Sequence, residues 1–318
     1  FLSNFIENVY LKKLIPDLRV AIPKTAVIGV DEFDNFLETN NLYDVIFEDK
    51  EYDHVLEAFR TARLSEKLRD NLRKYLQVMT KPLAVRSSGL FEDSLNQPFA
   101  GVYSTYLLPN NHPDFEHRLE DVENAIKLVF ASIYSPESRA YFNAIDYMIE
   151  EEKMAVIIQE VIGNEHNGRY YPEISGVAQS YNFYPFSYIQ PEDGFAVTAI
   201  GLGAYVVGGE KTHRFSPAYP KLQLASTQDK IKASQRYFYG VNMLAQDYDL
   251  YRDGENAAIK AYDISEAERD GTLEYTASVY DFMNDQITYD FSVKGPRIVD
   301  FSKILQYDYF PLAPTLQI

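Results

Sequence analysis

The sequence predicts a mixed α+β fold of two lobes, with a helix-rich first half and a strand-rich second half. Through most of residues 31–151, apolar residues recur at helical spacing. From Met154 onward, short apolar runs separated by turn residues are typical of strands. The change near residue 153 predicts a first lobe over residues 1–153 and a second over 154–318. The cleft between two lobes is the usual place for a ligand.

Helices account for most of the first lobe, and their starts carry recognisable signals. Asp31 suits an N-cap, Ser65 interrupts a long helical pattern, and Pro136 suits a first turn, where its missing N–H costs nothing. The expected elements are a helix over 1–14, a strand over 20–30 interrupted by Pro23, a helix over 32–39, two helices within 53–79, strands at 83–85 and 102–108, and helices over 114–132 and 136–151.

Strands account for most of the second lobe. The apolar run at residues 154–162 is long enough for a central strand, and one amphipathic helix is expected over 229–244. The further strands are expected over 175–182, 195–200, 274–282 and 286–293.

Composition excludes several classes of protein. The 318 residues include 47 Asp and Glu against 30 Lys and Arg, a net charge of −17, so the surface would repel nucleic acid and anionic membranes. With 46% hydrophobic residues the chain can support a core and is not disordered. It has no Cys, which excludes disulfide and thiolate chemistry and fits a reducing, cytoplasmic setting. No apolar run is long enough to span a membrane, and the first residues lack the features of a signal peptide.

One segment concentrates residues suited to binding an anion. The strand at 83–85 leads directly into Arg86 and Ser87, and the carboxylates Glu92 and Asp93 follow. The planar Arg side chain matches phosphate oxygens, while a hydroxyl and loop N–H groups complete an anion cradle. The competing interpretation is an ordinary turn in which Arg86 pairs with Glu92 or Asp93. The residues alone leave both open.

Two further places could contact a nucleotide. Gly101 opens a strand that contains Thr105, and a glycine there lets backbone approach a ligand closely. Gln159 and Glu160 interrupt an apolar strand just before Ile162, where backbone groups at a lobe hinge could meet the edge of an adenine ring. An ordinary turn and an edge strand with a kink are the simpler interpretations.

The second lobe has a glycine-rich turn at residues 201–209, followed by Lys211, His213 and Arg214, which form a local positive spot. The turn is neither a P-loop nor a dinucleotide fingerprint. The five histidines lack metal-ligand spacing and are expected at the surface, so no metal ligands are assigned. The tyrosine-rich stretches 181–188 and 237–239 are expected to pack in the core and between the lobes, with a partner-facing surface as the alternative.

Together these segments resemble the N-terminal nucleotide-binding domain of phosphoenolpyruvate synthase and pyruvate phosphate dikinase. The matched blocks keep the family's order between about residue 83 and residue 209. They are Leu83–Ser88, Glu92–Ser94, Phe99–Gly101, Thr105–Tyr106, Ile158–Val161, Ser175–Ala178 and Gly201–Gly209.

The resemblance implies an ATP-grasp-type fold that holds ATP between two lobes, and Mg²⁺ is expected with it because bound ATP phosphates usually require that ion. A phosphoryl group then passes to a His on a separate domain and finally to pyruvate on another. It implies that Arg86 grips the phosphates with Ser87 beside it, and that Gly101 and Thr105 form the loop over the phosphates. It also implies that Gln159, Glu160 and Ile162 form the adenine hinge. Phosphoryl transfer of this kind needs positioning and charge neutralisation rather than a protein nucleophile in this domain.

The departures from the family pattern shape the functional expectation. The family's Gly-Gly-Lys is absent and would lie upstream of Phe1, Val102 replaces its usual Gln, and Asp290 matches its metal-binding carboxylate poorly because no Gln-x-Arg follows. We therefore expect an excised ATP-binding portion of a kinase-type phosphotransferase that lacks turnover alone. The phosphohistidine and pyruvate-binding domains would lie outside this chain. The alternative is a non-catalytic regulatory module with the same fold that binds nucleotide or a partner.

Overall fold

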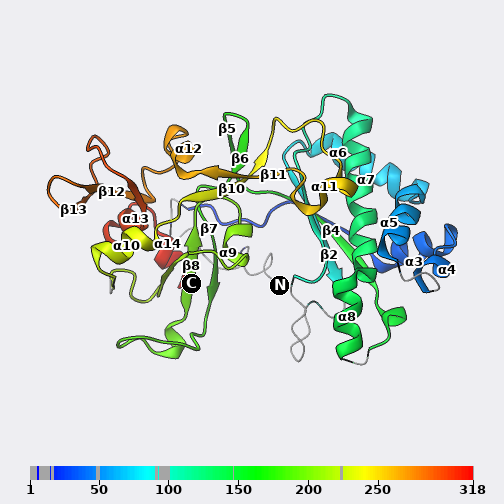
Figure 1. Ribbon diagram of the computed structural model, residues 1–318, viewed down its shortest axis with the longest axis horizontal. Coiled ribbons are helices and arrows are strands. Elements are labelled where there is room, and N and C mark those ends of the chain that lie inside the picture. The colour runs from blue at the N-terminus through cyan, green and yellow to red at the C-terminus, as the bar shows by residue number, and fades with distance from the viewer. Residues whose placement is uncertain are drawn as a thin grey trace. The chain divides into compact units, whose positions relative to one another are not determined.

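The computed structural model describes residues 6, 15, 18–47, 51–89, 92, 101–145, 147–222 and 225–317 (Figure 1). Helices and strands both contribute substantially, which confirms the α+β class. The chain forms two compact units. We call Pro23–Ile162 with Val241–Ile259 the helix-rich unit, and Phe1–Ile22, Gly163–Gly240 and Lys260–Ile318 the sheet-rich unit. The bounds of these units differ from those of the two expected lobes, 1–153 and 154–318. That two such lobes hold a nucleotide between them stays a prediction.

The helix-rich unit is built on one four-stranded antiparallel sheet in the order β1-β4-β2-β3. Its strands are β1 (Thr25–Ile28), β2 (Leu83–Gly89), β3 (Thr105–Leu108) and β4 (Met154–Glu160). Its helices are α3 (Val30–Thr39), α4 (Tyr43–Phe47), α5 (Tyr52–Thr61), α6 (Glu66–Val78), α7 (Phe115–Ala131), α8 (Pro136–Ala144) and α11 (Leu250–Asp253). The central position predicted for the strand after Met154 is confirmed, because β4 pairs with both β1 and β2.

Local capping explains where several helices begin. The Ser65 hydroxyl accepts the Leu68 N–H at 3.1 Å, so the helical pattern of residues 53–79 divides there, as expected. Ser135 caps α8 in the same way, with Pro136 in the first turn. Asp31, which we expected to be an N-cap, lies one residue inside α3, whose N-cap is Gly29.

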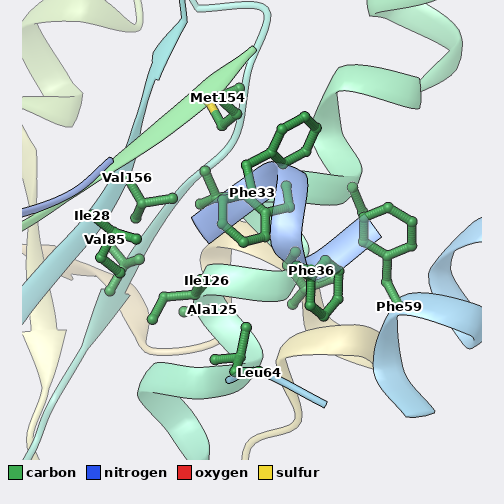
Figure 2. Packing of buried hydrophobic residues seen from close by; sticks show 14 of the residues in the cluster. Ile28, Phe33, Phe36, Phe59, Leu64, Val85, Ala125, Ile126, Met154 and Val156 are labelled. Carbon is green, nitrogen blue, oxygen red and sulfur yellow. The ribbon is translucent and has the colours of Figure 1, made fainter. Parts of the chain in front are cut away.

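The core of the helix-rich unit lies between its sheet and its helices (Figure 2). The rings of Phe33 and Phe36 on α3 contact Phe130 on α7 at centroid separations of 5.1 and 5.6 Å. Val85 and Val156 cover this core from the sheet side. The amphipathic spacing of the helices therefore fixes which sheet face is buried, and leaves the other face of the sheet open.

The sheet-rich unit contains three small sheets, in the orders β11-β10-β6-β5, β7-β8-β9 and β13-β12-β14. Its strands are β5 (Asn164–His166), β6 (Arg169–Tyr171), β7 (Ser175–Gln179), β8 (Phe195–Ala199), β9 (His213–Phe215), β10 (Tyr237–Asn242), β11 (Ile259–Asp263), β12 (Ala277–Asp281), β13 (Gln286–Thr288) and β14 (Arg297–Val299). Its helices are α9 (Ala204–Val207), α10 (Thr227–Ala233), α12 (Ile264–Arg269), α13 (Ser302–Tyr307) and α14 (Leu312–Leu316). A separate core forms around Tyr171, Phe238 and Phe301.

Several expected elements differ from those observed. The helix expected over 229–244 is wrong: α10 ends at Ala233, and the aromatic stretch after it forms β10, since aromatic side chains suit a half-buried sheet. The strand expected at 83–85 continues to Gly89, the strand expected over 102–108 begins at Thr105, and the helix expected over 136–151 ends at Ala144. The helix expected over residues 1–14 lies outside the described residues, apart from Ile6.

Candidate functional site

Arg86 lies on the open face of the helix-rich unit's sheet. Side chains alternate along β2, so Val85 and Ser87 are buried on the core side while Arg86 is exposed on the other. The register places Arg86 opposite Thr105 on β3 and opposite Ile157 on β4. Arg86 is therefore part of a strand rather than of the turn that follows it, and the sheet sets its direction.

The competing interpretation of Arg86 was an ion pair with Glu92 or Asp93. Glu92 instead accepts the Ser87 hydroxyl at 3.0 Å and the Gly89 N–H at 3.3 Å. Within the described residues Arg86 has no ion-pair partner, and Asp93 lies outside them. The guanidinium donors of Arg86 thus face solvent without a carboxylate from the described part of the chain.

Ser87 and Glu160 point away from Arg86, toward the core side of the sheet. The Ser87 side chain is 1% exposed and is held by Glu92. The Glu160 carboxylate is 2.7 Å from the Lys81 ammonium, and the Glu160 N–H donates to the Lys24 carbonyl at 2.9 Å. Their side chains therefore support the two strand ends, and Glu160 can face a ligand only through its backbone.

Gly101 and Thr105 lie at the start of β3. Gly101 has φ +81°, and a Cβ atom there would meet nothing within 4 Å, so the glycine suits the turn conformation rather than close packing. The Thr105 N–H donates to the Glu255 carboxylate at 3.2 Å. Glu255 belongs to a short segment 150 residues further along the chain, a contact that no local pattern in the sequence indicates.

The expected hinge lies at the end of β4. Gln159 shares the open face with Arg86 and donates to the Thr25 hydroxyl at 2.9 Å. Ile162 is 54% exposed, and its N–H has no hydrogen-bond acceptor within the described residues. Because Leu83 pairs with Glu160, Arg86 is three residues along β2 from the end of β4, or roughly 10 Å at about 3.3 Å per residue, and Ile162 lies two residues beyond that end.

A buried pair beneath the end of β2 escaped the sequence analysis. Glu152 is 2% exposed, and burial together with this carboxylate raises the pKa of Tyr103 well above its ordinary value. A Cβ atom on Gly89 would lie 2.7 Å from both side chains, so a larger residue there would have to displace one or both of them. These residues come from three segments, which is why spacing in the sequence gives no sign of the pair.

The expected site residues thus divide by face. The structure brings Arg86, Thr105 and Gln159 to the open face of one sheet, with Ile162 just beyond its edge. It places Ser87 and the Glu160 side chain on the other face. Asp290, the poor match to a metal ligand, is exposed after β13 and accepts the Ser292 N–H at 2.9 Å.

Two expectations about surface and core need correction. His213 is half-buried rather than fully exposed, and its ring lies 5.6 Å from that of Phe301. The stretch 181–188 is largely exposed rather than packed in the core, since Phe183 and Tyr184 are 73% and 83% exposed. In both cases the sheet-rich unit's tertiary packing, and not hydrophobicity along the chain, decides the outcome.

In the described part of the chain, His, Asp and Glu side chains form no group of three or more arranged to hold a metal ion. None of the helices within that part is long and apolar enough to cross a membrane.

Several proteins are similar to part of this chain in sequence. A phosphoenolpyruvate synthase of Aeropyrum pernix is 28% identical over 131 residues, 41% of this chain and 14% of that protein. A phosphoenolpyruvate synthase of Deinococcus radiodurans is 29% identical over 216 residues, 65% of this chain and 24% of that protein. An uncharacterized phosphotransferase of Bacillus subtilis, YvkC, is 26% identical over 194 residues, 60% of this chain and 20% of that protein. The chain spans a quarter or less of each relative.

The family itself is identified over most of the chain. Residues 7–273 match the pyruvate phosphate dikinase AMP/ATP-binding domain, a range that includes Arg86, the end of β4 and the glycine-rich turn. This chain therefore belongs to the family of the pyruvate phosphate dikinase AMP/ATP-binding domain.

Proposed function

We propose that this chain is the ATP-binding portion of a phosphoenolpyruvate-synthase-like phosphotransferase and that Arg86 grips the nucleotide's phosphates. One observation carries the proposal: an Arg without a carboxylate partner in the described part of the chain projects from the open face of a sheet, in a family of AMP/ATP-binding domains. Such a guanidinium offers paired donors to phosphate oxygens.

The same sheet offers a place for the base. The backbone at the end of β4 lies about 10 Å from Arg86 along the strands, and Ile162 follows two residues later, so one extended ligand could reach from Arg86 to this end of the sheet. Val27, 66% exposed on β1, and Ile157 on β4 give this face an apolar part suited to a flat ring. We infer that Gln159 and Ile162 contact the adenine edge, with Glu160 contributing its backbone only.

The proposed chemistry needs little from these residues beyond binding and orientation. In phosphoryl transfer, charge develops on the transferred group, and a fixed cation such as Arg86 would stabilise it. Thr105, opposite Arg86 on β3, would border the same group from the turn that begins at Gly101. Magnesium would enter bound to the nucleotide phosphates, where it neutralises charge. The acceptor His and the pyruvate site would lie on other domains.

The test is calorimetric titration of Mg-ATP into three proteins: the chain, its Arg86→Ala variant and an Arg63→Ala control. Arg63 is an exposed Arg of the same unit in the connection between α5 and α6, where its backbone N–H donates to the Asn40 side-chain oxygen at 2.9 Å. Losing charge-assisted bonds worth about 1.5–3 kcal/mol should weaken binding tenfold or more in Arg86→Ala and leave the control unchanged. Equal affinities for all three proteins would overturn the assignment of Arg86.

A second measurement addresses turnover. We infer that the chain alone does not hydrolyse ATP, because the family's Gly-Gly-Lys and Gln-x-Arg are not matched in it. Steady ATP hydrolysis that Arg86→Ala abolishes would contradict that inference and still support the site. Saturable partner or nucleotide binding that is indifferent to Arg86→Ala would favour the regulatory-module alternative.

A further inference from the structure

A second cationic site lies in the sheet-rich unit. A cavity of about 300 Å³ is lined by Lys211, His213 and Arg214 from β9 and the residues before it, and by Lys230 from α10. Its volume is at the low end of the range for small-molecule sites. The chain as a whole carries a charge of −17, so a cavity with three cationic side chains is a local exception.

Lys211 and Arg214 lack carboxylate partners in the described part of the chain. Other cations of the same unit do have them: Arg169 contacts Asp270 and Glu266, and Arg297 contacts Glu268. The charges of Lys211 and Arg214 are therefore not neutralised by an ion pair within that part. Uncompensated cations at a cavity attract an anion.

Neutral groups hold Arg214 in place. Its guanidinium carbon lies 3.9 Å from the centre of the Phe195 ring, and Nη2 donates to the Asn182 side-chain oxygen at 2.7 Å. Asn182 itself is 1% exposed, which makes it a rigid support. A guanidinium has five N–H donors, so most of those on Arg214 remain open. The side chain is thus oriented without losing its charge.

The two carboxylates in the cavity wall are occupied elsewhere. Asp300 is 4% exposed and accepts the Ser278 hydroxyl at 2.9 Å and the Ser302 hydroxyl at 2.7 Å. Asp229 accepts the Ser226 hydroxyl at 2.7 Å within its own helix start. Neither carboxylate forms an ion pair with Lys211 or Arg214, so the cations remain available to a ligand.

Much of the remaining wall is apolar and aromatic, although Thr198, Thr212 and Gln235 also line it. Phe186, Phe215 and Phe301 line it, together with Leu222 and Leu305. Such a surface favours a ligand with a compact apolar body, because burying that body removes apolar area from water.

We propose that this cavity binds a small organic anion, with Lys211 and Arg214 holding its phosphate or carboxylate group and the phenylalanines contacting its apolar part. The proposal stands on the sheet-rich unit alone and does not depend on the nucleotide site at Arg86. A negative result for this cavity would therefore leave the proposal for Arg86 unaffected.

The experiment compares three probes of similar body and different head: phenyl phosphate, benzoate and uncharged benzyl alcohol. Each is titrated into the chain by calorimetry, and by proton NMR of the His213 ring, which lines the cavity. A phosphate or carboxylate probe should bind saturably and shift the His213 resonance. Preference for phenyl phosphate or for benzoate identifies the head group. Benzyl alcohol binding as tightly as both anions would overturn the proposal.

The variants are Lys211→Gln and Arg214→Gln, with Lys232→Gln as the control. Lys232 is an exposed Lys on α10 outside the cavity wall. Lys211→Gln should lower the affinity for the anion about tenfold. It should preserve the fold, because Lys211 is exposed. Lys232→Gln should bind it as the parent does. Unchanged affinity in both Lys211→Gln and Arg214→Gln, or no saturable binding by the parent, would overturn the proposal.

Discussion

At the scale of single residues, the direction in which a side chain points decides what it can bind. Arg86 and Ser87 are neighbours in the chain, yet the pleat of β2 sends one to the open face and buries the other against Glu92. Asp270 illustrates the same dependence in the sheet-rich unit. Its buried carboxylate accepts hydrogen bonds from Nε and Nη2 of Arg169, at 3.0 and 2.6 Å, and from the Tyr171 hydroxyl at 2.9 Å. An acid that would be unremarkable in an exposed loop becomes the centre of a network.

Asp270→Asn should be strongly destabilising. Although burial opposes ionisation, hydrogen bonds from Arg169, Asn167 and Tyr171 lower the pKa of Asp270, so the charged form is present at neutral pH. The Asn side chain removes the charge from one side of this buried pair and leaves Glu266 as the carboxylate that Arg169 still contacts, which should cost about 1–3 kcal/mol. Urea unfolding followed by circular dichroism measures the loss. The matched control is Asp308→Asn, which breaks the exposed pair with Lys221 and should cost less than about 1 kcal/mol. Equal losses would refute this assignment.

His213 should make stability depend on pH. Burial lowers the pKa of His213 below its ordinary 6.5, so the unfolded chain binds this proton more readily than the folded one. Above pH 6.5 His213 is neutral in both states and does not lower the free energy of unfolding. As pH falls from 6.5 through the folded-state pKa, the unfolded chain takes up the proton first, and the free energy of unfolding decreases. The free energy of unfolding, measured at intervals from pH 8 to pH 5, should fall below pH 6.5. The fall should be smaller in His213→Gln than in His54→Gln, which alters an exposed His. An identical fall in both variants would contradict the prediction.

At the scale of elements, the glycine-rich turn after β8 shows which glycines are structural. Gly201 has φ +86°, and a Cβ atom there would lie 2.6 Å from the Tyr239 carbonyl oxygen. Gly203 has φ −57° and open space around it. The turn therefore connects β8 to α9 through one obligatory glycine, with the Leu202 N–H donating to the Tyr239 carbonyl at 2.8 Å.

Gly201→Ala and Gly203→Ala should differ in their effect on the free energy of unfolding, measured by thermal and urea unfolding. The first forces a side chain into a left-handed conformation, which costs about 1–2 kcal/mol before the contact with Tyr239 is counted. The second should be neutral or slightly stabilising, because the helical conformation suits Ala and the unfolded chain loses freedom. If Gly203→Ala proves as costly as Gly201→Ala, the turn is constrained by something other than backbone geometry.

At the scale of the whole molecule, the chain forms two units with separate cores. One core gathers Phe36, Phe59 and Phe130, and the other gathers Tyr171 and Phe238. Chain order does not divide them, since Val241–Ile259 belongs to the helix-rich unit although the sequence on either side belongs to the other. Tyr248 secures that segment by donating to Asp121 at 2.7 Å.

A substitution in one core should destabilise mainly the unit to which that core belongs. Phe59→Ala removes a ring that contacts Phe36 at 5.4 Å and Tyr134 at 6.0 Å, and should cost about 3–5 kcal/mol. Hydrogen exchange followed by mass spectrometry should then accelerate in Pro23–Ile162 and Val241–Ile259 more than elsewhere. Phe238→Ala is the reciprocal control and should act on the sheet-rich unit. Uniform acceleration by either variant would show that the units unfold together.

Much of the architecture could be predicted from the chain itself. Helical spacing and caps predicted α5, α6 and α7, and the apolar run after Met154 predicted the central strand, because these signals are local. The motifs around Arg86 and Gln159 identified the family for the same reason, since each is a short block whose residue order is preserved.

Only the tertiary structure decided which of those residues share a site. Strand pairing placed Arg86 opposite Thr105 and turned Ser87 away, and it brought Glu255 to the Thr105 N–H from 150 residues along the chain. Packing also half-buried His213 and exposed most of the aromatic stretch 181–188, against the expectation from hydrophobicity. Sheet register, face and burial depend on contacts between distant segments, whereas periodicity reports only on near neighbours. The sequence therefore determined the class, the family and the candidate residues, and long-range pairing determined their directions.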